Sequence, residues 1–357
     1  MNKATAAAAT VLALSAATVL SVSGSAPAAA GRRPAPVVQD HFDPLGPQVH
    51  ALRHAGRTVH YSDTGESGAR PVLFIGGTGT TARASGMTEF LRTTRENLGL
   101  RLISVERNGF GDTDYDPSLG FADYTGDVEA VLDHLGLGRV TVVAISGGGP
   151  YAAHLAAAHP GRIASLHLAA AEPPYGAKPA YCALDDAALS KELAGQIRDP
   201  RTWWAFPDDS PVHDIPGFTD RAEEDGARTY YQRGQQADPA PQVHEQRLYC
   251  ERPGPDATAL KAPVYVYTGE KDTTVPPEVQ ARWNDAFGSR VTVRRYADTG
   301  HDVQYRHWDQ VLLDMAGWAD RTAVCVGDHT RVLPAREAGA AVRHGAVLGG
   351  CAWKDAG

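Results

Sequence analysis

Short apolar runs that recur between helical patterns are the feature that most constrains this chain. Several of these runs are apolar at successive positions rather than at alternate ones, as in strands that are buried on both faces. The expected strands are residues 58–61, 71–75, 101–105, 140–145, 163–170, 263–268 and 291–296. Apolar residues at helical spacing between them predict helices near residues 86–98, 124–136, 147–159, 277–287 and 303–319. This alternation predicts an α/β fold, with a mostly parallel central sheet and helices on both faces.

Two segments interrupt the alternation and set the expected domain boundaries. Residues 173–258 are rich in aromatic, proline and acidic residues, and we expect an inserted, mostly helical cap there. Residues 321–357 carry two cysteines and no strong periodicity, which predicts a C-terminal tail held by a disulfide. The core is then formed by residues 50–172 and 259–320, and residues 31–49, rich in proline and small residues, form a flexible lead-in.

Composition excludes several function classes. The chain has 357 residues, of which 43% are hydrophobic and 21% charged, so a disordered chain is excluded. The formal net charge is -8, and no basic stripe is present, so we expect no nucleic-acid partner.

The first 30 residues have the pattern of a secretory signal peptide. A short basic start, Met1 to Lys3, precedes an apolar stretch from Ala4 to Val22 and then a run of small residues. We expect cleavage after Ala30, with Ala28 as the second choice, and therefore an extracellular protein without stable membrane insertion. The alternative is an uncleaved anchor, because the stretch is almost long enough to span a bilayer.

An even number of cysteines in an exported chain predicts disulfides. The four cysteines allow three pairings, which the sequence alone does not distinguish. We favour Cys182–Cys250 and Cys325–Cys351, since each pair would hold one irregular segment.

The strongest chemical motif is a serine among small residues between an apolar strand and an alanine-rich helix. It runs Ala144-Ile145-Ser146-Gly147-Gly148. A tight turn of this kind lifts the serine side chain out of the sheet. The start of the following helix directs its partial positive charge at an oxyanion formed above Ser146.

Two further residues complete a candidate triad. Asp272 follows the strand at 263–268, and His301 follows the strand at 291–296. The ends of parallel strands meet at one edge of a sheet, and Ser, Asp, His is the chain order of one known triad arrangement. Ser146 is the expected nucleophile, His301 the base, and Asp272 the acid that orients the histidine.

An oxyanion needs two backbone N–H donors. Gly147, directly after the serine, is one candidate. The second is expected from the turn after Ile75, where Gly77 and Thr78 remain open.

With these motifs the chain resembles the α/β-hydrolase superfamily over residues 50–172 and 259–320. The resemblance rests on five segments: His60 to Gly65, the glycine turn 76–79, Glu106 to Asp112, the serine turn, and the pair Gly269 to Asp272 with Gly300-His301. Ile75 and Ala144 replace the family's common histidine and glycine, and neither change removes a catalytic atom. The resemblance implies a cap in the position of residues 173–258. In some relatives the acid follows an earlier strand, which makes Glu172 an alternative to Asp272.

The cap carries the candidate substrate-binding residues. Trp203, Trp204 and Phe206 can line an apolar pocket or form the cap's own small core. The acidic run 223–225 is expected to be a solvated face. No phosphate-binding loop and no metal-ligand spacing is present, so no cofactor and no metal are implied.

These features predict a secreted serine hydrolase that cleaves a carboxylic ester through an acyl-serine intermediate. The expected partner is a small-molecule ester or a short peptide. One alternative is a secreted aminopeptidase or amidase on the same fold, in which Glu223, Glu224 or Asp225 would hold the substrate amine. The other is a non-hydrolytic protein that keeps the fold, because fold alone does not determine function.

Overall fold

Buried strands and the helices between them form one layered unit in the structure, a computed structural model. It describes residues 46–198, 210–215, 217–230, 238–251, 253–327 and 329–351. The strands of the larger sheet are β1 (Val49–His54), β2 (Arg57–Thr64), β3 (Arg70–Ile75), β4 (Leu100–Val105), β5 (Val140–Ile145), β6 (Ile163–Ala169), β7 (Val264–Gly269) and β8 (Val291–Tyr296). Their order is β1-β2-β4-β3-β5-β6-β7-β8. The pairs from β4 to β8 are parallel, and β2 is antiparallel to both of its neighbours.

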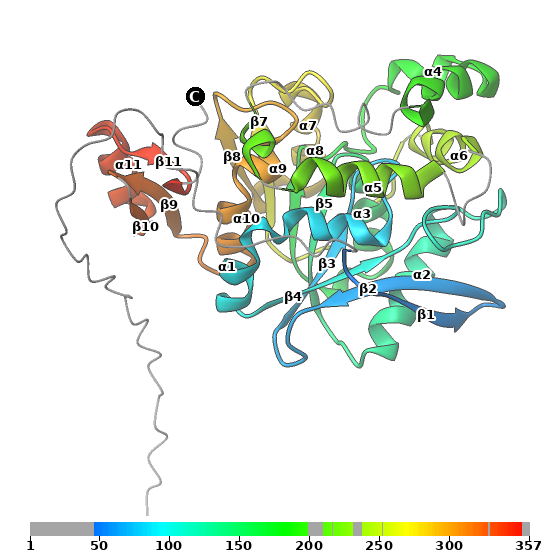
Figure 1. Ribbon diagram of the computed structural model, residues 1–357, viewed down its shortest axis with the longest axis horizontal. Coiled ribbons are helices and arrows are strands. Elements are labelled where there is room, and N and C mark those ends of the chain that lie inside the picture. Colours follow the sequence, from blue (N-terminus) through cyan, green and yellow to red (C-terminus); the bar gives the residue numbers. More distant parts are fainter. Residues whose placement is uncertain are drawn as a thin grey trace, which may run out of the picture. The chain divides into compact units, whose positions relative to one another are not determined.

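Helices cover both faces of this sheet (Figure 1). The α-helices of the core are α1 (Arg92–Asn97), α2 (Phe121–His134), α3 (Gly148–Ala158), α7 (Pro277–Gln280), α8 (Trp283–Phe287), α9 (Val303–Arg306) and α10 (Trp308–Met315). Side chains of α2, α3 and α8 form one apolar cluster with Leu73 and Ile75 of β3. Side chains of α9, α10 and the 3-10 helix η1 (Ala82–Leu91) form the other with Val72 and Phe74. Neighbouring side chains of β3 thus enter opposite layers, which explains why its sequence is apolar throughout.

Three expected helices differ in detail from the structure. The helix expected at 86–98 is the tighter η1 followed by α1, and Gly86 inside η1 lies against Pro47, where a Cβ would be only 2.8 Å from the proline ring. The expected helix at 277–287 is divided into α7 and α8, and the one at 303–319 into α9 and α10. Helical periodicity does not detect these short breaks.

The described part of the segment between β6 and β7 is helical. Its α-helices are α4 (Asp186–Arg198), α5 (Phe218–Tyr230) and α6 (Ala240–Tyr249). Leu189 and Leu193 of α4 pack on Val243 of α6 in a small cluster. By contrast, Phe218 and Ala222 of α5 join the main apolar cluster that contains η1. Part of this segment therefore packs directly on the core.

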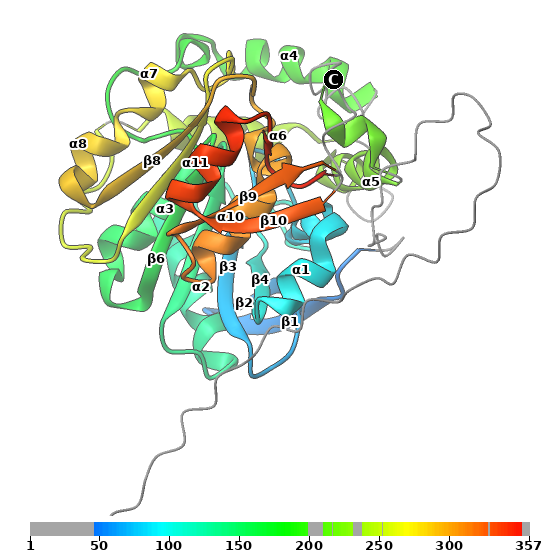
Figure 2. The same ribbon diagram turned by 90° about the vertical axis from the view of Figure 1, so that its left-hand side faces the viewer.

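The C-terminal residues, for which the sequence predicted a tail held by a disulfide, form a small unit of strands and one helix. The unit consists of β9 (Arg321–Val326), β10 (His329–Pro334), α11 (Ala335–Arg343) and β11 (Val347–Leu348), with strand order β10-β9-β11 (Figure 2). The deeply buried apolar residues of this unit are Ala323, Val324 and Cys325 of β9 and Ala338 of α11. Strands this short and this exposed give little apolar periodicity, which is why the sequence did not reveal them.

Both disulfides are those favoured from the sequence. Cys182 and Cys250 are bonded at 2.00 Å, and Cys325 and Cys351 at 2.11 Å. The first joins the beginning of the segment between β6 and β7 to the C-terminal end of α6. The second joins β9 to the residues that follow β11.

Candidate active site

Ser146 occupies a sharp turn between β5 and α3. Its φ is +48°, in the left-handed region that residues with a side chain rarely adopt. The N–H of Ser146 donates to the carbonyl of Ala169 over 3.2 Å, and its own carbonyl accepts from the N–H of Glu172 over 2.9 Å. The turn is thereby fixed to the end of β6, and the strain at Ser146 is held by the surrounding backbone.

The residues after the serine are glycines because backbone approaches them closely. A Cβ on Gly148 would lie 2.5 Å from the carbonyl oxygen of Ile75, and one on Gly149 would overlap the carbonyl oxygen of Glu172. Only glycine therefore allows α3 to begin so close to β3 and to the end of β6.

The three side chains of the candidate triad meet at the carboxyl ends of β5, β7 and β8. Nε2 of His301 lies 3.0 Å from Oγ of Ser146. Nδ1 of His301 lies 2.9 Å from Oδ2 and 3.1 Å from Oδ1 of Asp272. The carboxylate is fully buried, whereas a quarter of the histidine side chain is exposed. Such a chain of hydrogen bonds can take a proton from a serine hydroxyl and stabilise the imidazolium that results.

Asp272 is held by donors that the sequence did not indicate. Its Oδ1 accepts from the backbone N–H groups of Thr274 and Val275, both at 2.9 Å. Its Oδ2 accepts from Nε2 of Gln280 at 3.2 Å, and the same amide is fixed by Thr268, whose hydroxyl donates to Oε1 over 3.0 Å. Gln280 was missed because a lone glutamine in a helix carries no distinguishing pattern.

The loop that carries His301 is fixed by a second buried acid. Oδ1 of Asp302 accepts from the N–H of Gly300 over 3.2 Å, and its other oxygen accepts from the hydroxyl of Ser210. Arg306 lies 3.3 Å from the same carboxylate. The residue next to the imidazole therefore joins the loop both to α9 and to the segment between β6 and β7.

The candidate oxyanion residues lie beside the serine. Ile75 and Ala144 are register partners in neighbouring strands, so the turn after β3 meets the turn after β5. A Cβ on Gly77 would be 3.4 Å from Cβ of Ser146, and one on Gly147 would be 2.9 Å from the backbone nitrogen of Thr78. Gly77, Thr78 and Gly147 are thus brought together around Ser146, and both candidates for the second donor remain adjacent to it.

Three other sequence expectations have different outcomes. The acid in contact with His301 is Asp272, and Glu172 instead meets the serine turn through its backbone. Trp203, Trp204 and Phe206 lie outside the described residues. The acidic run 223–225 is not simply a solvated face, because Asp225 is buried and accepts hydrogen bonds from the N–H and the hydroxyl of Thr81. Burial raises the pKa of Asp225 to about 6.

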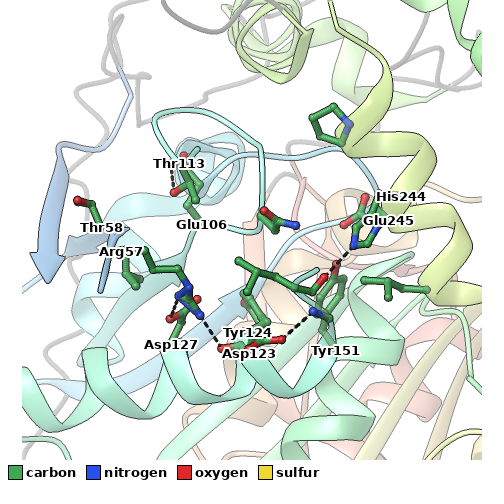
Figure 3. A pocket seen from close by; sticks show the side chains of 16 residues that line it. Arg57, Thr58, Glu106, Thr113, Asp123, Tyr124, Asp127, Tyr151, His244 and Glu245 are labelled. Atoms are coloured by element: carbon green, nitrogen blue, oxygen red, sulfur yellow. Dashed lines mark hydrogen bonds and ion pairs between the residues drawn. The ribbon is translucent and has the colours of Figure 1, made fainter. Parts of the chain in front are cut away.

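A small pocket lies between α2, α6 and the residues after β4, and it is not in contact with Ser146 (Figure 3). Glu106, Tyr151 and Glu245 line it together with Asp123 and His244. Its volume, about 20 Å³, is enough for a water molecule or two. It is therefore too small for a substrate.

Within the described residues, no group of three or more His, Cys, Asp or Glu side chains is arranged to hold a metal ion. No helix in the same part of the chain has the length and apolar character needed to cross a membrane.

Comparison with known proteins shows the family of the chain. Residues 70–307 match the family model described as alpha/beta hydrolase fold, which is more than half of the chain. The chain belongs to the α/β hydrolase fold family. The mostly parallel sheet with helices on both faces agrees with this fold.

Curated relatives match over a shorter length. The chain is 31% identical over 124 residues to an uncharacterized hydrolase, YcgS, of Bacillus subtilis (strain 168), which covers 35% of this chain and 42% of that protein. It is 36% identical over 124 residues to a non-heme chloroperoxidase of Streptomyces lividans, covering 33% and 43%. The chain thus spans less than half the length of these curated relatives.

Solved structures match over most of the fold. A structure from a study of carboxylesterases of Nitrososphaera gargenis has a TM-score of 0.58 at 18% identity, covering 76% of this chain and 98% of that one. The enol-lactonase of Burkholderia xenovorans LB400 has a TM-score of 0.56 at 16% identity, covering 76% and 99%. At these identities the likeness concerns the fold.

Proposed function

We propose that this α/β hydrolase fold protein is a serine hydrolase that cleaves a carboxylic ester through an acyl-serine intermediate. The observation that carries the proposal is the continuous hydrogen-bond chain from Asp272 through His301 to Ser146. The carboxylesterase and enol-lactonase named among the similar folds support an ester rather than an amide substrate.

The geometry suits two successive acyl transfers. Oγ of Ser146 attacks the carbonyl carbon while Nε2 of His301 accepts the hydroxyl proton, and Asp272 stabilises the imidazolium. The N–H of Gly147 and that of Gly77 or Thr78 stabilise the negative oxygen of the tetrahedral intermediate. His301 then gives its proton to the leaving alkoxide as the acyl carbon–oxygen bond breaks. Water, deprotonated by the same imidazole, attacks the acyl-serine and releases the acid.

A fluorophosphonate probe together with a substrate panel tests this proposal. We expect the probe to label the wild-type chain and to leave Ser146→Ala unlabelled. Among p-nitrophenyl esters and aminoacyl anilides, we expect turnover of the esters, fastest for small to medium apolar acyl groups. A folded wild-type protein that takes no label and hydrolyses neither class would contradict the proposal, and turnover of the anilides alone would replace esterase with aminopeptidase.

We further propose that the protein acts outside the cell. The signal-like residues 1–30 and the two disulfides support export, since disulfides persist mainly in oxidising compartments. N-terminal sequencing of protein from the culture medium should begin at Gly31 or Ala29. A cell-bound protein that retains Met1 would contradict export.

A further inference from the structure

Buried charged side chains form hydrogen bonds with the turn between β3 and η1, residues 76–82. Arg107 donates to the carbonyls of Gly76, Gly77 and Thr80 and to the hydroxyl of Thr80. Oε2 of Glu245 accepts from the N–H of Gly79 over 2.7 Å. These contacts hold the backbone on both sides of Thr78, so the position of the turn depends on them.

The next residues of the chain are held in the same way. Oδ2 of Asp225 accepts from the N–H of Thr81 over 3.3 Å, and Oδ1 accepts from the Thr81 hydroxyl over 2.5 Å. Oε1 of Glu106 accepts from the N–H of Ala82 over 3.3 Å. Three carboxylates and one guanidinium therefore determine the path of residues 76–82.

Two of these carboxylates come from the segment between β6 and β7. Asp225 belongs to α5 and Glu245 to α6, and Figure 3 shows Glu245 on α6 beside the pocket lined by Tyr151. Glu245 also forms an ion pair with Arg107, with 3.1 Å between Oε1 and Nη1. The same residues that contact the turn thus join it to two helices far away in the sequence.

The burial of these groups is unusual for a purely structural contact. Arg107, Asp225 and Glu245 are each at most 3% exposed. Removing such charges from water is costly, and well-packed apolar side chains often stabilise a core equally well. Apolar side chains, however, cannot accept hydrogen bonds from the N–H groups of Gly79 and Thr81. The charged groups therefore provide fixed backbone geometry.

We propose that Asp225 and Glu245 are positioning residues for hydrolysis. They hold the turn 76–82 so that the N–H group of Gly77 or Thr78 meets the oxyanion. Through them, that geometry depends on how α5 and α6 pack on the core. The inference rests on the proposed function, because the turn matters for catalysis only if Ser146 forms a tetrahedral intermediate. Neither residue contacts the reacting atoms.

Two substitutions that preserve shape test the proposal. Glu245→Gln and Asp225→Asn each keep an acceptor oxygen but lose the negative charge, and Glu245→Gln also loses the ion pair with Arg107. Asp314→Asn is the matched control, because Asp314 is a buried acid paired with Arg294 at 2.5 Å and does not contact the turn. For each variant, kcat and KM for a p-nitrophenyl ester, the inactivation rate with a fluorophosphonate, and Tm are measured.

A positioning role and a structural role give different results. We expect kcat of Glu245→Gln to fall roughly tenfold to a hundredfold, approaching the loss of one oxyanion donor, while KM changes little. The phosphonate inactivation rate should also fall, because displacement of fluoride passes through a five-coordinate phosphorus whose phosphoryl oxygen uses the same N–H donors. Asp314→Asn should have a lower Tm than the wild type but the same kcat. Wild-type kcat and inactivation rate in both test variants, with only Tm lowered, would overturn the proposal.

Hydrogen exchange separates this inference from the proposed function. Backbone exchange at residues 76–82 is compared between wild type, Glu245→Gln and Asp314→Asn without substrate. Faster exchange at the turn in Glu245→Gln alone supports the positioning role, and unchanged exchange contradicts it. If wild type neither hydrolyses esters nor takes the phosphonate, the proposed function fails, and the exchange result still decides whether Glu245 holds the turn.

Discussion

Nε2 of Gln280 donates to Oδ2 of Asp272 over 3.2 Å, so a neutral amide of α7 helps to fix the acid of the candidate triad. The same nitrogen donates to the carbonyl of Val275 over 2.7 Å. Gln280 is itself buried and fixed by Thr268, which leaves the amide a single orientation. The orientation of His301 thus depends on a residue that does not touch it.

We predict that Gln280→Met, which has a similar volume but no amide, lowers kcat about tenfold. A hydrogen bond to a charged group typically contributes about 1.5–3 kcal/mol, and part of that energy here orients Asp272. Gln280→Glu should be worse, because two carboxylates at hydrogen-bond distance cannot both be ionised easily. Steady-state kinetics with a p-nitrophenyl ester measures both. A Met variant with wild-type kcat would show that the two backbone donors at Thr274 and Val275 suffice.

The sequence predicted the fold and the candidate triad because their signals are local. Ser146, Asp272 and His301 each follow a strand of the larger sheet, and parallel strands bring their carboxyl ends to one edge. The five-residue serine motif and the chain order of the three residues were therefore enough to predict that these side chains lie close together.

The supporting residues could not be predicted in the same way. Glu245 contacts Gly79 across 166 positions of sequence, and Asp225 contacts Thr81 across 144. Nothing in the sequence around Asp225 distinguishes a buried acceptor from a solvated acid, so the acidic run was assigned to a solvated face. These contacts form only when α5 and α6 pack on the core, so no local sequence pattern indicates them.

Activity should fall on acidification. Nε2 of His301 must be unprotonated to accept the proton of Ser146, so we predict that ester hydrolysis slows on acidification. The pH profile of kcat/KM for a stable p-nitrophenyl ester, recorded where the protein remains folded, checks this. A rate that stays level down to pH 4 would argue against His301 as the base.

Gly149→Ala should damage the serine turn. The added Cβ would overlap the carbonyl oxygen of Glu172, whose N–H holds the carbonyl of Ser146. Overpacking of this kind costs about 1–3 kcal/mol, so we expect a lower free energy of unfolding together with slower labelling of Ser146. Gly161→Ala is the control, since nothing lies within 4 Å of its Cβ position. Equal labelling rates in both variants would contradict the steric argument.

Buried histidines should make the fold sensitive to acid. Burial lowers the pKa of His167 to about 3, where Tyr267 and Ser165 bind its two ring nitrogens. Between pH 3 and 6.5 the unfolded chain therefore binds more protons at this residue than the folded chain does. The contribution of His167 to the free energy of unfolding is therefore largest above pH 6.5. It decreases by about 1.4 kcal/mol per pH unit as the pH falls below that value.

We predict that His167→Gln reduces this loss between pH 4 and 6, measured as the free energy of unfolding in urea. His329→Gln, a change of an exposed histidine, is the control. Glu106 contributes in the opposite sense, because burial raises its pKa to about 7 and so favours the folded state on acidification. Its contribution is common to both variants and cancels in the comparison. Parallel pH dependences for the two variants would contradict the role of His167.

The two disulfides should differ in their effect on activity. Cys250 directly follows α6, which carries Glu245, whereas Cys325 and Cys351 lie in the C-terminal unit. Replacing either pair by serine should lower the free energy of unfolding by about 2–4 kcal/mol, and more for Cys182–Cys250, which closes a longer loop. Only the loss of Cys182–Cys250 should also lower kcat, because α6 then holds the turn at Gly79 less firmly. Measuring kcat of both double variants well below their Tm separates the effect on activity from the effect on stability. An equal kcat in both variants would show that packing alone positions α6.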